Sequence, residues 1–266
     1  MLTAEQRSEF AERGLLRLAG ITDPEVVGAL RERVLAFLAE RKLVPESPPP
    51  GFTLTPSVAA SVVNAHGFEE TWGAPVLDAV DDLLGAGAWH VPKHAGQLLA
   101  MTWPQSGVTW QIPHKSWHLD YRAPGTLRTA PGVQLFLCLD AVEPRAGGTL
   151  VAAGTPRLID AIRRRRGPSW LGRSADARAE LRAEAPWFRE LCALRSGEDR
   201  IARFMSQAGQ HAGVSLRVEE LTGVPGDVYA MHPWMVHAAA LSNCGARPRM
   251  VLTERIRCTR DVTMPG

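Results

Sequence analysis

The sequence predicts an α+β protein with a mainly β core, arranged as an antiparallel sandwich or a jelly roll. Three features of the 266 residues favour this class. Amphipathic helical patterns fill much of the first 90 residues, short strand-like runs follow, and a helical insert at about 156–210 interrupts them. The length suits one large domain or two small ones. We expect a single domain over 1–266, with a mainly helical part over 1–90 and the β core over 91–266.

Capping signals mark the helices of the first part. Thr3-x-x-Gln6 is a capping box, and Asp23 followed by Pro24 is an N-cap with proline at the first helical position. Apolar residues recur every three or four positions after Pro24, which indicates a helix that packs rather than one that carries chemistry. The predicted elements are a helix ending at Gly14, a strand over Leu15–Leu18, a helix from Asp23 to about Lys42, a proline-rich loop over Pro45–Pro56 and a helix over Pro75–Leu84.

Strand-like runs dominate from residue 96 onward. They are short, largely apolar, and separated by Pro-Gly and Gly-Gly turns. One stretch rich in Ala, Arg, Glu and Leu returns to helical composition, and Pro186 breaks it. The predicted strands are Gly96–Trp103, Trp117–Tyr121, Val133–Leu139, Thr149–Ala152, Val214–Glu219, Asp227–Met231, Val236–Leu241 and Arg249–Cys258, and the predicted helical segments of the insert are Pro156–Arg166 and Ala175–Met205.

Composition argues against several classes of function. The formal net charge is only +2, and much of the basic excess lies in Arg163–Arg166, which we interpret as a solvated helix end; no nucleic-acid partner is expected. Four cysteines without a C-x-x-C pair argue against a zinc ribbon, and we expect Cys138 and Cys258 to be buried thiols. The N-terminus has no signal-peptide pattern, and no window holds 18 uninterrupted apolar residues. We therefore expect no membrane partner and a reducing, cytoplasmic location.

The stretch Ser116–Tyr121 carries the most informative motif. On a strand, His118 and Asp120 would point to the same face and could hold one metal ion, while Trp117 would face away. With 8 histidines and 28 acidic residues in 266 positions, about one His-x-Asp/Glu match is expected by chance, so the motif alone is unspecific. His237 is the best candidate for a third ligand. Two histidines and one carboxylate with open positions are the arrangement of non-haem Fe(II) oxygenases.

Further motifs follow the His-x-Asp pair in a fixed order. In chain order the set is Gly96-Gln97, His118-x-Asp120, Leu139-Asp140, Gly147-Gly148-Thr149, Gly154-Thr155-Pro156, His237 and Arg249. This order and spacing resembles the phytanoyl-CoA dioxygenase family of Fe(II)/2-oxoglutarate oxygenases over most of the chain. The resemblance implies a double-stranded β-helix, a cupin-like jelly roll that holds iron near its open mouth.

The resemblance also implies roles for individual residues. His118, Asp120 and His237 match the family's metal ligands, and Arg249 matches the arginine that holds the far carboxylate of 2-oxoglutarate. A guanidinium can pair bidentately with a carboxylate, which suits that role. Arg247 is a rival two residues earlier, but it precedes a proline and is expected to lie in the turn.

Other positions carry weaker assignments. Thr149 matches a position near the cosubstrate, and Gln97 lies on a strand that is expected to line the same cavity. His114 and Tyr121, on either side of the metal motif, are candidates for contact with substrate. His232 lies before a proline break, and we expect it to be structural rather than a ligand.

The function predicted from these residues is that of an oxygenase using Fe(II), 2-oxoglutarate and O2, with release of succinate and CO2. Related halogenases lack the carboxylate ligand so that chloride can bind, and Asp120 therefore favours hydroxylation or another oxidation. We expect hydroxylation of an unactivated C–H bond in a small organic substrate, while desaturation, epimerisation and ring formation stay open. Two alternatives stay open: a cupin-like metal enzyme without 2-oxoglutarate, against which Arg249 argues, and a non-catalytic jelly-roll binding protein, against which the intact ligands argue. The sequence predicts neither the substrate nor the oligomeric state, because loops and inserts make the substrate contacts in this scaffold.

Overall fold

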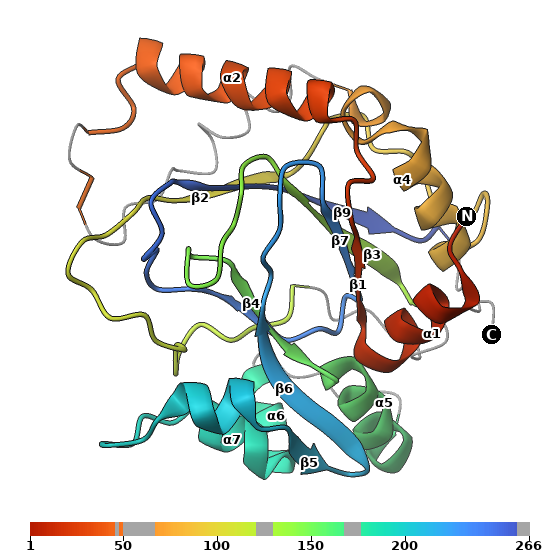
Figure 1. The fold of residues 1–266 in the computed structure, drawn as a ribbon. Helices are drawn as coiled ribbons and strands as arrows, with labels where there is room; N and C mark the ends of the chain where they lie inside the picture. Colours follow the sequence, from red (N-terminus) through yellow and green to blue (C-terminus); the bar gives the residue numbers. More distant parts are fainter. Residues whose placement is uncertain (46–47, 50–66, 121–129, 168–176, 260–266) are drawn as a thin grey trace.

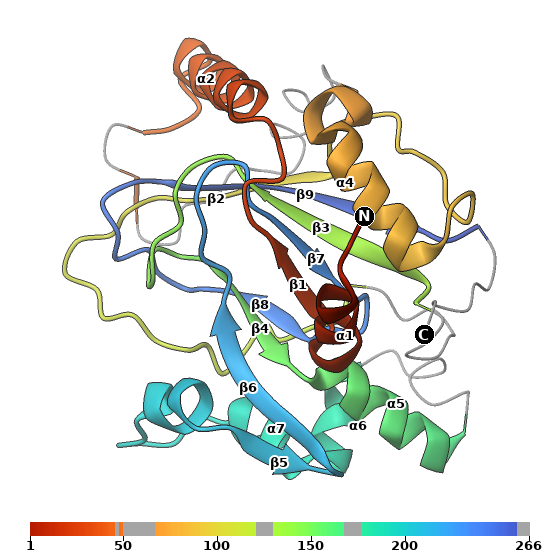
Figure 2. The same cartoon turned by 45° about the vertical axis from the view of Figure 1, so that its right-hand side comes forward.

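Two antiparallel sheets form the centre of the computed structural model, which describes residues 1–45, 48–49, 67–120, 130–167 and 177–259. The larger sheet has the strand order β1-β7-β3-β9-β2 and the smaller sheet the order β5-β6-β4-β8. Helices lie outside both sheets: α2 and α4 over the larger one, and α5, α6 and α7 beside the smaller one (Figures 1 and 2). This is the α+β arrangement that the sequence predicts.

Most strands coincide with the predicted segments. The strands are β1 (Leu15–Leu18), β2 (Leu98–Thr102), β3 (Gly132–Cys138), β4 (Thr149–Ala153), β5 (Gly209–His211), β6 (Val214–Glu220), β7 (Val228–Met231), β8 (His237–Ala239) and β9 (Arg249–Arg257). The prediction of a strand over Trp117–Tyr121 is wrong for residues 117–120, where His118 forms only an isolated bridge with His237. Tyr121 itself lies outside the described residues.

The helices agree with the sequence in the first part and differ in the insert. They are α1 (Ala4–Arg13), α2 (Pro24–Glu40), α4 (Phe68–Leu84), α5 (Thr155–Arg166), α6 (Ala177–Glu184), α7 (Pro186–Leu191) and a π-helical turn, η1 (Ala202–Ser206). The span α4 comprises two helical segments that meet at a kink, because Gly73 has non-helical angles (φ 74°, ψ 164°); Pro75 lies at the start of the second segment, where the sequence predicts a helix to begin. The expected helix Ala175–Met205 is divided into α6, α7 and η1, with Pro186 at the predicted break. Most of the proline-rich loop Pro45–Pro56 lies outside the described residues.

Three apolar clusters hold the layers together. Strand β3 shows the principle: Val133, Leu135 and Leu137 point outward to α2 and α4, whereas Phe136 and Cys138 point inward between the sheets. Because side chains alternate along a strand, the two sets cannot mix. A third cluster packs α5, α6 and α7 against the outer face of the smaller sheet. The inner face of β3 and β9 is therefore the surface from which a site between the sheets is built.

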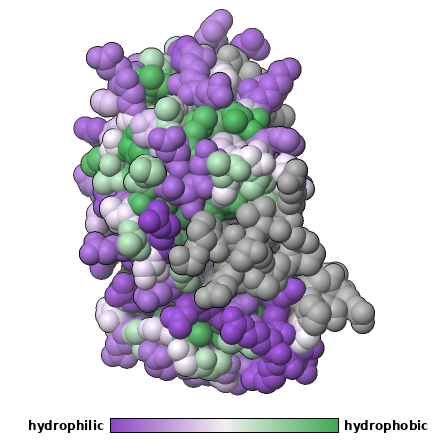
Figure 3. Space-filling model, turned by 90° about the vertical axis from the view of Figure 1, so that its right-hand side faces the viewer, coloured by the Kyte–Doolittle hydropathy of each residue, from purple (hydrophilic) through white to green (hydrophobic). Residues whose placement is uncertain are grey.

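The basic run in α5 is paired within the protein. Arg164 contacts Asp160 at 2.6 Å, while Arg165 and Arg166 contact Glu184 at 2.5 and 3.1 Å. The end of the molecule where the insert lies is mainly hydrophilic on the face drawn in Figure 3. The interpretation of this run as a solvated helix end is confirmed for Arg164, Arg165 and Arg166, which are exposed. It is wrong for Arg163, which is buried and lies over the Trp234 ring at 5.1 Å.

Two further predictions concern burial. Cys138 is buried as expected, but Cys258 is only partly buried because it lies just after the exposed last residue of β9. Within the described ranges, no helix combines the length and the apolar character that a bilayer crossing requires.

Asp227 joins the first strand to the β core. Its buried carboxylate accepts hydrogen bonds from Arg17 Nη2 at 2.6 Å, from the Gly20 N–H at 2.8 Å and from the Val224 N–H at 3.0 Å. Burial alone would raise the pKa of this carboxyl, but the three donors outweigh burial and hold the pKa below its usual value.

We predict that Asp227→Asn lowers the free energy of unfolding by about 2 kcal/mol at pH 7, because hydrogen bonds to a charged acceptor are lost. A carboxyl whose folded pKa is lowered stabilises the fold above its unfolded pKa of about 4, and loses this effect as the pH falls through the folded pKa. The difference between variant and wild type should therefore shrink in urea titrations below about pH 4. Asp23→Asn at the exposed cap of α2 is the control and should be nearly silent, because Asp and Asn cap equally well; an equal loss in both variants would contradict the role of Asp227.

Candidate metal centre

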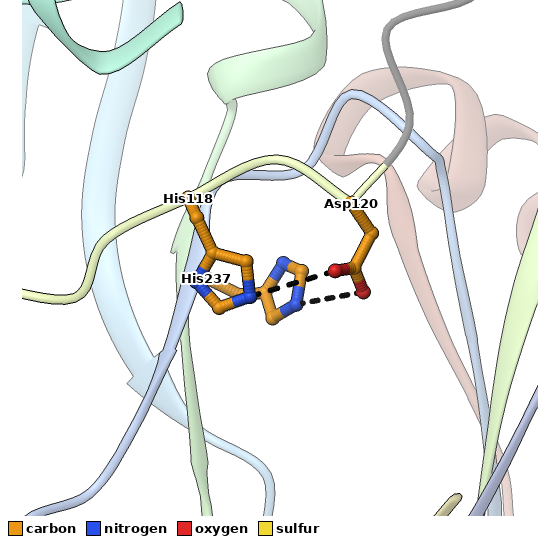
Figure 4. Close-up of side chains that lie close together, drawn as sticks. All are labelled: His118, Asp120 and His237. Carbon is orange, nitrogen blue, oxygen red and sulfur yellow. Dashed lines mark ion pairs between the residues drawn. The ribbon is translucent and has the colours of Figure 1, made fainter. Parts of the chain in front are cut away.

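Three side chains from two distant segments converge between the sheets. His118 and Asp120 lie on the loop before β3 and His237 lies on β8, and one ligand atom of each lies within 4.8 Å of the others (Figure 4). His118 Nε2 is 3.5 Å from Asp120 Oδ1, and His237 Nε2 is 3.2 Å from Asp120 Oδ2. The arrangement is that of a facial triad with one open side. The structure therefore brings together the three residues that the motif analysis selected.

Backbone pairing explains why the two imidazoles meet. The His118 N–H donates to the His237 carbonyl at 3.0 Å, and the His237 N–H donates to the His118 carbonyl at 3.0 Å. Residues that exchange both bonds across an antiparallel pair project their side chains on the same side. The rings accordingly lie 4.3 Å apart, centroid to centroid. Asp120, two residues after His118, reaches the same side.

Backbone carbonyls fix which nitrogen of each imidazole faces the centre. His118 Nδ1 lies 2.7 Å from the Ser116 carbonyl, and His237 Nδ1 lies 3.1 Å from the Met235 carbonyl. A carbonyl only accepts, so Nδ1 carries the proton in both rings and Nε2 is available as a ligand. Both rings are thus oriented as a metal site requires.

The Asp120 carboxylate is the electrostatic centre of the site. Besides the two histidines, Gln134 Nε2 donates to Oδ2 at 2.9 Å and Arg255 Nη2 lies 2.8 Å from the same oxygen. Burial alone would raise the pKa of Asp120, but hydrogen bonds from His118, His237 and Gln134 hold it well below its usual range. The same hydrogen bond with Asp120 raises the pKa of His118 despite burial. The carboxylate is therefore ionised at neutral pH and ready to bind a cation.

A buried arginine lies on the inner face of β9. Arg249 Nη2 donates to Thr149 Oγ1 at 2.6 Å, while Nε is buried and has no hydrogen-bond partner among the described residues. Burial lowers the pKa of the Arg249 guanidinium to about 10, so the group is still charged at neutral pH. Glu220 is close enough to influence Arg249, but it accepts hydrogen bonds from the Arg145 and Gly148 N–H groups, and burial raises its pKa. A buried cation with a free donor is suited to an anionic ligand.

The rival arginine and the weaker assignments lie elsewhere. Arg247 precedes β9 in the turn, as predicted; its side chain is 69% exposed and lies 3.7 Å from Asp140. Gln97 lies just before β2, two residues before Leu99, whose side chain points outward. The Gln97 side chain is exposed as well, so its position does not support a contact with the cosubstrate. His114 is partly buried on the loop before His118. Tyr121 falls outside the described residues.

Two neighbours of the triad have structural positions. His232 is fully buried, burial lowers its pKa to about 3, and its Nδ1 accepts from the Trp234 N–H at 3.0 Å. It packs between Phe10 and Trp234, away from the triad. Trp117 is buried in the cluster under the insert, facing away from the ligands as predicted, although its segment is not a strand.

Sequence reasoning missed the two residues that hold Asp120. Gln134 and Arg255 are register partners on β3 and β9, so they lie directly opposite each other. The available signal was strand alternation: Arg255 is six residues after Arg249 and therefore on the same face of β9. Alternation alone did not connect Arg255 with Asp120, because Asp120 lies on a loop whose position relative to β9 no sequence pattern predicts.

The sequence matches the model of the phytanoyl-CoA dioxygenase (PhyH) family over residues 10–251. The chain belongs to this family. As a PhyH-family protein it is an Fe(II)/2-oxoglutarate-dependent oxygenase, and Fe(II), 2-oxoglutarate and O2 are its cofactor and cosubstrates. Among proteins of curated function, no sequence matches this PhyH-family chain.

Three solved structures resemble the PhyH-family chain in fold. The non-haem α-ketoglutarate-dependent carbocyclase SnoK from nogalamycin biosynthesis is 14% identical, with a TM-score of 0.53 over 100% of this chain and 87% of its own. HygX from Streptomyces hygroscopicus, solved with nickel and 2-oxoglutarate bound, is 15% identical, with a TM-score of 0.51 over 97% and 88%. EctD from S. alaskensis is 16% identical, with a TM-score of 0.52 over 98% and 78%. These likenesses confirm the jelly-roll fold.

The geometry predicts which histidine is indispensable for metal. We expect His237→Ala to abolish tight binding of Ni(II) or Fe(II), because a ligand is lost, whereas His232→Ala should lower stability and leave metal affinity within a few-fold of wild type. The measurement is the rise in Tm of the metal-free protein when metal is added. A free metal concentration of 100 times Kd should raise the free energy of unfolding by about 2.7 kcal/mol. A normal rise in His237→Ala together with its loss in His232→Ala would move the third ligand to His232.

Proposed function

We propose that this PhyH-family oxygenase hydroxylates an unactivated C–H bond of a small organic molecule, with His118, Asp120 and His237 as iron ligands. The observation that carries the proposal is the convergence of two Nε2 atoms and one ionised carboxylate within 4.8 Å. Iron bound there would supply the activation of O2. Family membership supports a small-molecule substrate.

The chain's own residues suit that ion. Nδ1 of each histidine is committed to a carbonyl, which leaves the Nε2 lone pairs for metal. Asp120 contributes the one negative charge among the three ligands, and Gln134 and Arg255 hold its Oδ2 side. Three protein ligands leave the remaining positions to cosubstrates, as in other facial triads.

The second part of the proposal is that Arg249 binds the far carboxylate of 2-oxoglutarate, with Thr149 beside it. Full burial, a charge that persists at neutral pH and an unpartnered Nε support this role. The Thr149 hydroxyl already orients Nη2 at 2.6 Å and could also donate to an anion. Burial shields the Arg249 guanidinium from solvent, and a charge-assisted pair is stronger when it is desolvated.

Asp120 supports hydroxylation over halogenation. A halogenase needs the carboxylate position free for halide, and here a carboxylate occupies it, fixed by donors from two strands. His114 and Tyr121 stay as proposed substrate contacts because both flank the metal motif in sequence.

We also propose that the whole chain acts as one domain. Strand β1, from the mainly helical first part, pairs with β7 near the end of the chain along four residue pairs. The first part therefore contributes a strand to the β core that carries His237 and Arg249.

One alternative is a cupin-like metal enzyme without 2-oxoglutarate, and the burial of Arg249 argues against it. Such an enzyme has no need of a fully buried arginine with a free donor. The deciding experiment is a screen of small organic molecules with Fe(II), ascorbate and 2-oxoglutarate, following succinate. Substrate-dependent succinate with a product 16 mass units heavier supports hydroxylation, whereas turnover without succinate would support the cupin alternative, and metal binding without any turnover a binding protein.

The assignment of Arg249 predicts a specific mutant pair. Arg249→Lys keeps the charge but loses the planar fork, so we expect the Kd for 2-oxoglutarate to rise by about tenfold or more, from the loss of one to two charge-assisted hydrogen bonds. Arg247→Lys, at an exposed position, should change it by less than about twofold. A 2-oxoglutarate titration of the anaerobic iron complex, followed by its visible charge-transfer band, measures both. The reverse pattern would place the cosubstrate carboxylate at Arg247.

A further inference from the structure

Arg200, in the helical insert, is a buried arginine far in sequence from the metal motif. Its side chain is 8% exposed, and its guanidinium donates to four backbone carbonyls. Two lie at the end of α7 and just beyond it: Leu191 at 2.6 Å and Ala193 at 2.9 Å. The other two belong to the loop that carries the metal motif: Ile112 and Pro113, both at 3.2 Å. One side chain thus ties the insert to that loop.

The tie continues toward the ligands. The Pro113 carbonyl also accepts a hydrogen bond from Trp117 Nε1 at 2.8 Å, and Trp117 is buried in the cluster formed by the insert. The residue after Trp117 is His118. Arg200 and Trp117 therefore donate to the same carbonyl, that of Pro113, which lies five residues before His118, the first ligand of the metal site.

The loop needs such support because it is not part of a sheet. Among the described residues of 117–120, the only ladder contact is the bridge of His118 to His237. The insert supplies what a neighbouring strand would otherwise supply: fixed donors for the loop's carbonyls. Burial lowers the pKa of Arg200 and opposes its placement, yet the group is fully engaged with acceptors.

We propose that Arg200 is a positioning residue of the metal centre, which holds the loop so that His118 and Asp120 stay in ligand geometry. The proposal rests on the function proposed for the triad. Ligands act only within narrow tolerances of distance and angle, and changes to residues that orient ligands typically cost 10–100-fold in metal affinity. The helical insert then has a role in metal binding as well as in packing.

The test compares two arginines of the same segment. Arg200→Met removes the donors but keeps an apolar stem, and Arg200→Lys keeps the charge with fewer donors. Arg203→Met is the matched control: Arg203 also lies over the Phe204 ring, at 5.4 Å against 4.9 Å for Arg200, but it pairs with Glu190 instead of the loop. If Arg200→Met fails to fold, Arg200→Lys serves as the test variant.

Two readouts are taken on metal-free protein well below each variant's Tm. Calorimetric titration with Ni(II) should show Kd raised about tenfold or more in Arg200→Met, less in Arg200→Lys, and less than threefold in Arg203→Met. Hydrogen exchange of peptides covering residues 110–120 should speed up in the Arg200 variants only. A role confined to stability would lower Tm and leave both readouts at the wild-type level.

The outcomes separate this proposal from the one it rests on. If wild-type protein does not bind Ni(II), or His237→Ala binds it equally well, the proposed metal centre fails. If wild type binds in a His237-dependent manner and the Arg200 variants match it, the metal centre stands and the role of Arg200 is overturned. An equal loss in Arg203→Met would also overturn it, because the effect would then come from the insert in general.

Discussion

The metal centre depends on one pair of backbone hydrogen bonds, those exchanged between His118 and His237. In such a pair the two Cα atoms lie about 5.5 Å apart and both side chains leave on the same face. Two ligands that are distant in sequence are thereby brought into register without any direct attraction between them. Asp120 then needs only the spacing of two residues to reach the same side. A loop can therefore supply the His-x-Asp pair, provided that this bridge holds and the rest of the loop is fixed by other contacts.

The carboxylate is held from the opposite side of the jelly roll. His237 belongs to the smaller sheet, whereas Gln134 and Arg255, which contact Asp120 Oδ2, belong to adjacent strands of the larger one. The site thus bridges both sheets. A buried carboxylate without partners would cost several kcal/mol, and the donors of Gln134 and Arg255 offset part of that cost. Contacts from both sheets therefore fix the position of the Asp120 carboxylate.

Local signals predicted the fold and half of the site. The capping box at Thr3, the proline at position 24 and the alternation along β3 and β9 each act within a few residues, and the structure confirms the elements they predicted. The His-x-Asp motif and His237 were found because metal ligation restricts residue type so strongly. Arg200, Gln134 and Arg255 were not found, because their roles arise from contacts across 14 to 135 positions that leave no periodic pattern. The strand expected over Trp117–Tyr121 shows the same limit: alternation of apolar and polar residues appears there, since one side packs on the insert, without any strand partner.

Arg249 is a buried charge that packing alone does not account for. A guanidinium that is buried completely and has no ion pair among the described residues is a costly feature next to apolar inward residues such as Val251. Thr149 satisfies one of its donors, and Glu220 is committed to the N–H groups of the loop before β4. A chain selected for stability alone would carry an aliphatic residue at this position. In the proposed role of Arg249, a carboxylate of the cosubstrate would pair with this charge, and its binding would then stabilise the β core around the site.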